Sequence, residues 1–468
     1  TVLLICVGTY CLTARPADQY SQKTYLSLRP QGINAAMEKT TWHEHAYKKH
    51  TDTIKTHLQV TPFFQKSQHQ NDLGTYFGIG NGTNSFTVGD TAPPAPAPGA
   101  PKTVTADIAS NLLIHGADRT NLGTVTLNPE QTLYGVRLDL FQHVGHPFAK
   151  MFFKASAPFV RVENSMNLKV TGGAKAQVQV LAPAAQTKDF SLEDFFAGTV
   201  LIDMNGSTNL QTPLTKAKIV GTRSRMGLAD LDVSLGYKFL YREKNHCFAS
   251  VDLTIPTGNH PSGEYLFEAV YGNGNHVGLG LSVDTGTQIW TKDKSRLDVL
   301  WTMRYKYLFQ GTEVRTPGVK DIKLGHYFMA GVPGQRAGTS LFPAANTLTQ
   351  GLSVKPGSVF DTMFDVAFNS SNFTVDLGYS LFWKDTESVH VKSFADGKLA
   401  LATAAYNTTA NFATADQLKA INAADLDVAA VTTPAFLTHK FSAGLGYTTK
   451  MYQQYRATIG LGAAYEMG

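Results

Sequence analysis

Residues 231–256 contain two stretches in which apolar and polar side chains alternate with a period of two. The apolar positions of the first stretch are Leu231, Val233, Leu235, Tyr237, Phe239 and Tyr241. After a short charged turn, the alternation resumes at Cys247, Ala249, Val251, Leu253 and Ile255. A period of two is typical of a β-strand and not of a helix. The region therefore predicts a β-hairpin with one apolar face and one polar face.

Alternation alone does not distinguish a membrane barrel from a soluble sandwich, because the strands of both classes alternate in this way. The length of the strands does distinguish them. A strand that spans a bilayer needs about 9–11 residues, whereas the usual globular strand has about 5–6. Both stretches meet the longer requirement. Tyr237, Phe239 and Tyr241 also lie next to the turn, where a barrel would carry its aromatic girdle. We therefore expect the apolar face to contact lipid and the polar face to line a lumen.

The composition of the 468-residue chain agrees with a lipid-facing surface. Charged residues make up 16% of the chain, compared with about 25% in soluble proteins, and aromatic residues reach 11%. The net charge is +5, with both signs scattered along the chain. No basic stripe is present, so the sequence does not indicate a nucleic-acid partner.

Five further pairs of alternating stretches accompany the central one. They are 58–65 with 73–80, 134–140 with 151–159, 277–289 with 297–309, 362–368 with 373–383, and 441–447 with 455–467. We therefore predict an all-β fold, a closed antiparallel transmembrane β-barrel of about 12 strands over residues 58–468. Another strand pair hidden in a loop would make 14 strands. The large loops are expected at 81–131, 166–226, 310–358 and 385–438.

The six hairpins raise a topological difficulty. If all tight turns lie at one end of the barrel, then both chain ends and every long loop lie at the other end. Outer-membrane barrels instead keep the termini and the short turns together. Either this barrel departs from that rule, or one strand is hidden, with 322–332 as the candidate.

The N-terminal region divides into two parts. Residues 1–17 combine an apolar run with a stretch of small residues, as the h-region and cleavage region of a signal peptide do, and the segment is either removed or retained. Residues 18–57 are polar and without periodicity, which predicts an N-terminal arm or a plug inside the barrel. His43, His45 and His50 do not follow metal-ligand spacing, so we predict no metal site there. Without the leader, Cys247 stands alone and no disulfide framework is expected.

Within the loop 166–226, residues 191–196 predict a short helix. Ser191 is suited to the N-cap position and Asp194 lies three residues later, as in a capping box. Such a helix either folds into the pore and narrows it or lies on the rim.

One segment resembles a known family. Residues 253–258 read Leu-Thr-Ile-Pro-Thr-Gly, and they are followed by Tyr265-Leu266-Phe267, Gly272-Asn273-Gly274 and an alternating strand. This run resembles a strand–loop–strand segment of the bacterial outer-membrane β-barrel porin-like proteins related to FadL and the phenol meta-pathway channels. The resemblance covers about forty residues and implies a transport barrel, with a hydrophobic or aromatic solute for FadL relatives. The chain departs from that group because residues 18–57 show no FadL-type hatch.

Alternation assigns a set of charged residues to the inner face. The candidate pore-lining residues are Arg137, Asp139, Asp232, Lys238, Asp252, Asp284, Asp298, Arg304, Lys306, Asp365 and Asp376. Their mixed sign predicts weak ion selectivity if the lumen is open. Alternatively, these charges pair with one another and block a narrow barrel.

The functional prediction is a porin-like channel of the bacterial outer membrane for passive diffusion of small solutes. The alternatives are a structural or lattice-forming envelope barrel with a blocked lumen, and FadL-like uptake of hydrophobic solutes. Membrane lipid and small solutes are the expected partners, and homo-oligomerisation stays open. The sequence has no Gly-x-Ser-x-Gly elbow and no His-Glu-x-x-His motif, so we predict no enzyme activity, no catalytic residues and no cofactor.

Overall fold

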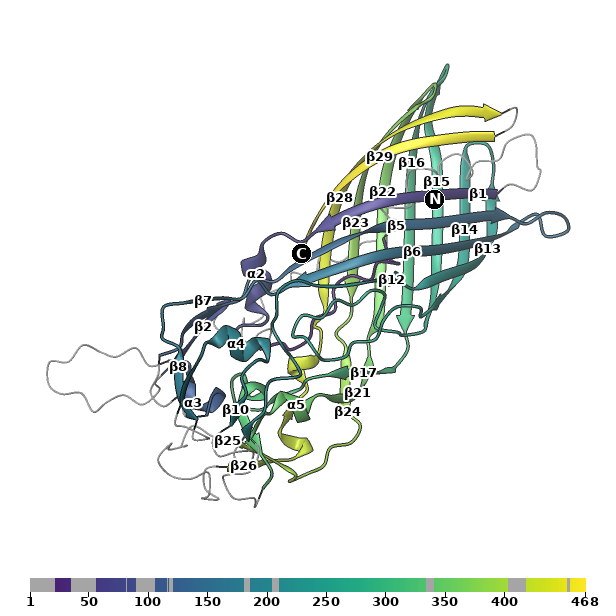
Figure 1. Ribbon diagram of the computed structural model, residues 1–468. Coiled ribbons are helices and arrows are strands. Elements are labelled where there is room, and N and C mark those ends of the chain that lie inside the picture. Colours follow the sequence, from purple (N-terminus) through teal and green to yellow (C-terminus); the bar gives the residue numbers. More distant parts are fainter. Residues whose placement is uncertain are drawn as a thin grey trace.

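The structure is a computed structural model, and it describes residues 22–34, 56–80, 82–89, 106–115, 117, 121–180, 186–203, 210–333, 341–402, 418–452 and 455–468. Strands make up 58% of these residues and helices 8%, so the fold is all-β, as the alternation predicts. A large curled antiparallel sheet forms a half-barrel, and a second body of loops, short strands and short helices covers one end of it (Figure 1).

The large sheet is built from long strands that are mostly neighbours along the chain. Their order is β1 (Thr56–Lys66), β5 (Glu130–His143), β6 (Met151–Ser165), β13 (Leu231–Tyr241), β14 (Asn245–Ile255), β15 (Gly278–Lys292), β16 (Ser295–Leu308), β22 (Gly357–Ser370), β23 (Phe373–Lys384), β28 (Phe436–Tyr452) and β29 (Tyr455–Met467). A further strand, β12 (Arg223–Leu228), pairs with β6 beyond the part that β13 occupies. β12 and β13 therefore share one position in the sheet, which has eleven positions among the described residues.

The two faces of this sheet differ sharply in polarity. Leu377 in β23 and Leu461 in β29 are 63% and 77% exposed on the convex face. Side chains at the alternate positions are mostly polar or charged, and most of them are buried on the concave face. This division into an apolar and a polar face follows from the two-residue repeat of a strand, in which successive side chains point to opposite faces.

The first predicted hairpin is wrong. β1 pairs along its whole length with β5, not with residues 73–80. The apolar residues of 73–80 serve another purpose, because this stretch forms the end of helix α2 (Gln70–Thr75) and a turn that buries Phe77 and Ile79. The region 322–332 holds only η3 (Gly325–Tyr327) and β19 (Met329–Gly331), and it adds no strand to the large sheet.

The long connections between the sheet strands gather at one end and form a body that we call the cap. The described residues of the segments 67–129, 166–222, 256–277, 309–356 and 385–435 belong to it, and they lie opposite the short hairpin turns (Figure 1). The cap has its own apolar core, to which Phe86, Leu113, Phe196, Tyr327 and Leu401 belong. This core explains why so many apolar residues occur in segments without strand periodicity.

Short elements make up the cap. Its strands are β2 (Ser85–Gly89), β3 (Ile108–Ala109), β4 (Gly123–Thr126), β7 (Lys169–Thr171), β8 (Ala176–Val180), β9 (Gln186–Phe190), β10 (Ile202–Asp203), β11 (Leu210–Gln211), β17 (Gly311–Arg315), β18 (Gly318–Val319), β20 (Phe342–Pro343), β21 (Gln350–Lys355), β24 (Ser388–Val391), β25 (Leu399–Ala402), β26 (Leu418–Ile421) and β27 (Leu426–Asp427), besides β19. Its helices are α3 (Ser110–Leu113), α4 (Leu192–Ala197), α5 (Ala345–Leu348), η5 (Ala423–Asp425) and η6 (Ala429–Val431), besides α2 and η3. None of the helices in the described ranges is long and apolar enough to cross a bilayer.

The predicted capped helix is confirmed as α4. The amide of Asp194 donates to the Ser191 hydroxyl at 3.2 Å, and the amide of Ser191 donates to the Asp194 carboxylate at 2.9 Å. Phe195 and Phe196 are buried, and Phe196 meets the ring of Tyr327 edge to face at 5.0 Å. The helix therefore packs in the core of the cap.

Candidate functional site

The concave face of the large sheet gathers the charged side chains that the alternation assigns to the interior. Arg137, Asp139, Lys238, Asp252, Asp298, Lys306, Asp365 and Asp376 are buried, while Asp232, Asp284 and Arg304 are half-buried. Arg304 lies directly opposite Asp361 of β22 in the strand register. All eleven predicted pore-lining residues thus occupy the alternate strand positions that face the concave side of the sheet.

Two ion pairs join strands that are not neighbours. Lys306 of β16 binds the carboxylate of Asp232 in β13 and the hydroxyl of Thr254. Lys154 of β6 binds Asp284 of β15. Each pair of strands is three positions apart in the sheet order, which is about 14 Å on a flat sheet. The curl of the sheet brings these side chains together across its interior.

Other interior charges are satisfied by nearer partners. The guanidinium of Arg137 lies 2.9 Å from Asp139. Asp298 accepts a hydrogen bond from Arg296 and another from Asn369, each at 3.0 Å. Lys238 donates to the carbonyl of Ala149 at 3.0 Å, and Asp252 accepts hydrogen bonds from Ser250 and Ser282. Much of the concave face is thus a network of paired charges.

Residues 22–34, which we call the inner segment, run from the cap onto the concave face. Arg29 forms ion pairs at 2.9 Å with both Asp361 and Glu466. The carbonyl of Gly32 accepts a hydrogen bond from Arg137 at 3.4 Å, and Asn34 accepts one from Lys440 at 3.3 Å. The inner segment therefore touches strands from both halves of the sheet.

The inner segment also has an apolar anchor. Ile33 packs in a small cluster with Leu308, Val359 and Phe382, and the guanidinium of Arg29 lies 4.3 Å above the Phe382 ring. The rest of the predicted arm, 18–21 and 35–55, lies outside the described residues, as do His43, His45 and His50.

Three charged residues on the concave face are not among the predicted pore-lining residues. Lys440 and Glu466 lie opposite each other in β28 and β29 and form an ion pair at 2.7 Å. Lys440 is followed by the exposed Phe441, and Glu466 lies between the exposed Tyr465 and Met467, so the two-residue period already carries the signal that finds both charges. Arg29 lies in a stretch without periodicity, and no pattern marks it.

A row of buried charges joins the cap to the sheet. His276 contacts the carboxylate of Glu313 at 2.7 Å, and Glu313 pairs with Arg315 at 2.8 Å. Arg315 reaches Glu387 at 2.7 Å, and Lys384 reaches the same carboxylate at 3.0 Å. Burial opposes the ionisation of Glu387, but the two cations outweigh it and hold the pKa of Glu387 well below its usual value.

This row also holds the start of the inner segment. The guanidinium of Arg315 lies 3.6 Å above the ring of Tyr25, and Thr24 donates a hydrogen bond to the carbonyl of Thr316. Burial, as the largest cause, raises the pKa of the Tyr25 hydroxyl. The path of the inner segment is therefore fixed both in the cap and on the concave face.

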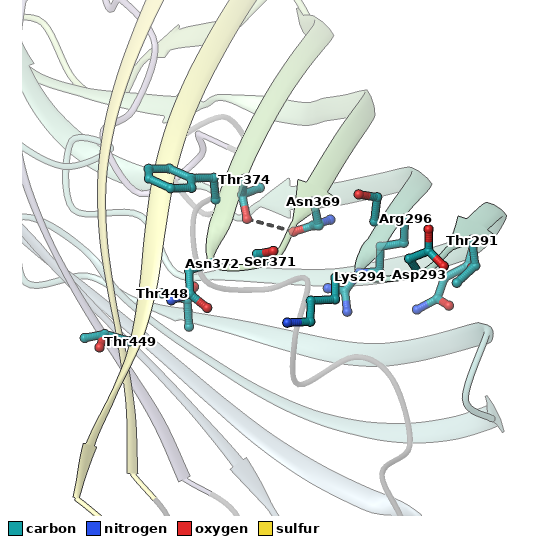
Figure 2. A pocket seen from close by; sticks show the side chains of 13 residues that line it. Thr291, Asp293, Lys294, Arg296, Asn369, Ser371, Asn372, Thr374, Thr448 and Thr449 are labelled. Atoms are coloured by element: carbon teal, nitrogen blue, oxygen red, sulfur yellow. Dashed lines mark hydrogen bonds between the residues drawn. The ribbon is translucent and has the colours of Figure 1, made fainter.

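A polar cavity of about 620 Å³ lies near the hairpin turns (Figure 2). Its lining includes Gln288, Arg296, Asn369, Thr374 and Thr448, which belong to five different strands. The hydroxyl of Thr374 donates to the Asn369 side chain at 2.7 Å. Hydroxyl and amide groups dominate this wall, so the cavity suits water and polar solutes.

In the described part of the chain, no group of three or more His, Cys, Asp and Glu side chains gathers in a way that could hold a metal ion. Cys247 carries a free thiol and is half-buried in β14.

Comparison with known proteins gives no family assignment. No family model matches the sequence. No curated protein matches it either.

Proposed function

We propose that this chain is a β-barrel protein of the bacterial outer membrane that acts as a channel for small polar solutes. The observation that carries the proposal is the inverted polarity of the large sheet, apolar outside and charged inside. Soluble monomers rarely expose apolar patches of more than a few hundred Å². The apolar convex face extends over strands from β1 to β29, and a bilayer is the environment that covers such a surface.

Closure of the sheet is part of this proposal. β1 and β29 are the two ends of the strand order. In hydrocarbon, each unpaired backbone amide or carbonyl costs several kcal/mol, so spanning sheets close into barrels. The eleven strand positions, joined by a seam between β1 and β29, would satisfy this requirement. The inner segment supports closure, because Arg29 and Gly32 link β29 and β5 through Glu466 and Arg137.

The proposed channel is closed at rest. The inner segment and the paired charges occupy the concave face toward the cap, and the cap covers that end. The polar cavity near the hairpin turns leaves space for solute at the other end. Passage then requires the inner segment to withdraw, and the mixed charges of the wall favour weak ion selectivity.

A second candidate is a structural envelope barrel whose lumen stays blocked. The dense pairing of the interior charges favours it, because an aqueous pore does not need its lining to be neutralised in this way. The two candidates differ in one property, the conductance of the protein after its inner segment is loosened.

Two measurements on the purified full chain test these proposals. Trp301 lies on the convex face of β16, stacked on Phe364 at 5.9 Å, so brominated acyl chains in vesicles should quench its fluorescence. In planar bilayers, the wild-type protein should give small or rare conductance steps, and Arg29→Ala should give larger and more frequent ones. Arg225→Ala, an exposed position in β12, is the matched control. Absence of quenching would overturn the membrane assignment, and silence of both proteins would favour the structural barrel.

A further inference from the structure

The short hairpin turns at the end away from the cap are tied into one continuous rim. The amide of Lys238 donates to the carbonyl of Lys150, and the amide of Gln288 donates to the carbonyl of Lys244, both at 2.8 Å. The amide of Ser371 donates to the carbonyl of Lys294 at 3.0 Å. Each turn is thus held against the next strand or turn, and its side chains have fixed neighbours.

This rim is positively charged. Lys150, Arg242, Lys244, Lys292 and Lys294 are exposed in or directly beside the turns that join β5 to β6, β13 to β14 and β15 to β16. We call these five residues the basic rim. Glu243 and Asp293 are the two carboxylates of the same turns. Five cations against two anions leave a net charge of +3 along this part of the edge.

Exposed aromatic side chains accompany the basic rim on the same end of the sheet. Trp290 stacks on Phe368 with 6.5 Å between ring centres and 27° between the ring planes, and Tyr237 meets Phe239 edge to face at 5.1 Å. The ammonium group of Lys150 lies 5.8 Å from the centre of the Tyr237 ring. Amphipathic rings of this kind prefer the boundary between hydrocarbon and water. In the proposed membrane location, the basic rim therefore lies at the depth of the lipid headgroups.

We propose that the basic rim binds the headgroups of anionic phospholipids in the leaflet on the hairpin side. This inference rests on the proposed membrane location and adds a lipid class and a surface to it. Basic residues next to an anionic leaflet each contribute about 1 kcal/mol of attraction. The continuous rim holds its cations next to one another, so it collects negatively charged lipids around this end of the barrel.

The test uses the full chain with Trp290 as its only tryptophan, after Trp42→Phe, Trp301→Phe and Trp383→Phe. Vesicles contain a fixed fraction of brominated lipid, either with a phosphatidylglycerol headgroup or with a phosphatidylcholine headgroup. At low salt, we expect brominated phosphatidylglycerol to quench Trp290 as strongly as about a threefold larger fraction of brominated phosphatidylcholine does. High salt should abolish this difference, because it screens exposed charges.

Variants that replace lysine by the uncharged glutamine show which lysines cause the preference for phosphatidylglycerol. In this background, Lys244→Gln, Lys292→Gln and Lys294→Gln together should remove the preference for phosphatidylglycerol. The matched control is Lys66→Gln, Lys320→Gln and Lys355→Gln, three exposed lysines at the opposite end of the sheet or in the cap. The control should keep the preference. Circular dichroism confirms that each variant is folded.

The outcomes separate this proposal from the membrane assignment. Equal quenching of Trp290 by both lipids, or a preference that survives in the rim variant, overturns the basic rim as a lipid site. A second protein with Trp301 as its only tryptophan reports whether the convex face of the sheet lies in the bilayer. If neither brominated lipid quenches Trp301, the membrane assignment fails and the rim proposal falls with it.

Discussion

Arg29 and Asp361 form an ion pair of 2.9 Å in which the Asp361 carboxylate is fully buried. The same guanidinium reaches Glu466 at 2.9 Å and covers the ring of Phe382. One side chain from a stretch without secondary structure therefore joins β22, β23 and β29. The stability of the interior and the closed state of the proposed channel both depend on it.

Arg29→Ala should destabilise the protein strongly. It leaves the Asp361 carboxylate buried without this cation, and removal of one partner of a buried pair costs about 3–5 kcal/mol. Urea unfolding of the vesicle-bound protein measures this free energy. Asp361→Asn in the same chain should recover part of the loss, because it removes the stranded charge. Arg225→Ala, the exposed control, should change the free energy of unfolding by less than about 0.5 kcal/mol.

Leu377→Arg should impair membrane insertion. Leu377 is exposed on the convex face of β23, and an arginine on the lipid face of a barrel costs about 2–4 kcal/mol near the bilayer midplane. Flotation of refolded protein with vesicles should show a smaller bound fraction. Leu201→Arg, at an exposed apolar position in the cap, is the control and should float as the wild type does. Equal flotation of both variants would place the convex face outside the bilayer.

Gly236→Ala should destabilise the wall formed by β6 and β13. A Cβ atom at Gly236 would lie 2.1 Å from the Phe152 ring, which is fully buried between Phe141 and Phe248. Overpacking of this kind costs about 1–3 kcal/mol. Gly446→Ala is the control, because its nearest neighbours lie at 3.6 and 3.7 Å, an ordinary contact distance. A thermal unfolding midpoint that drops equally in both variants would contradict this account.

The cap should lose stability in acid through His326. Burial lowers the pKa of His326 to about 3, compared with about 6.5 in an unfolded chain. The folded cap keeps the ring neutral, whereas the unfolded chain takes up a proton below about pH 6.5, so the free energy of unfolding falls by up to about 1.4 kcal/mol per pH unit between these values. His326→Gln should flatten this dependence, as followed by hydrogen exchange of cap amides from pH 7 to pH 4. An unchanged slope would exclude His326 as its origin.

Local periodicity predicts the long strands well. The hairpins β5–β6, β13–β14, β15–β16, β22–β23 and β28–β29 match predicted pairs, because each is encoded by two adjacent alternating stretches. The same period places Arg137 and Asp376 on the concave face. It does not reveal that Lys306 meets Asp232, since that contact depends on the curl of four strands.

The two-residue period does not predict the structure of the cap or of the inner segment. The cap core assembles Phe86, Phe196 and Leu401 from three different connections, so its pattern exists only in three dimensions. The incorrect prediction that β1 pairs with residues 73–80 has the same cause. A stretch near it in sequence looked apolar, but it serves the cap core, and the true partner β5 follows only after a long insertion.

The eleven positions of the large sheet have a directional consequence. Since every neighbouring pair is antiparallel, the first and last strands, β1 and β29, point the same way. If the sheet closes as we propose, the seam between β1 and β29 is parallel, and a parallel ladder is slightly weaker per residue than an antiparallel one. If a lateral force pulls the strands of the barrel apart, separation should begin at the seam between β1 and β29, next to the strand whose Glu466 binds Arg29.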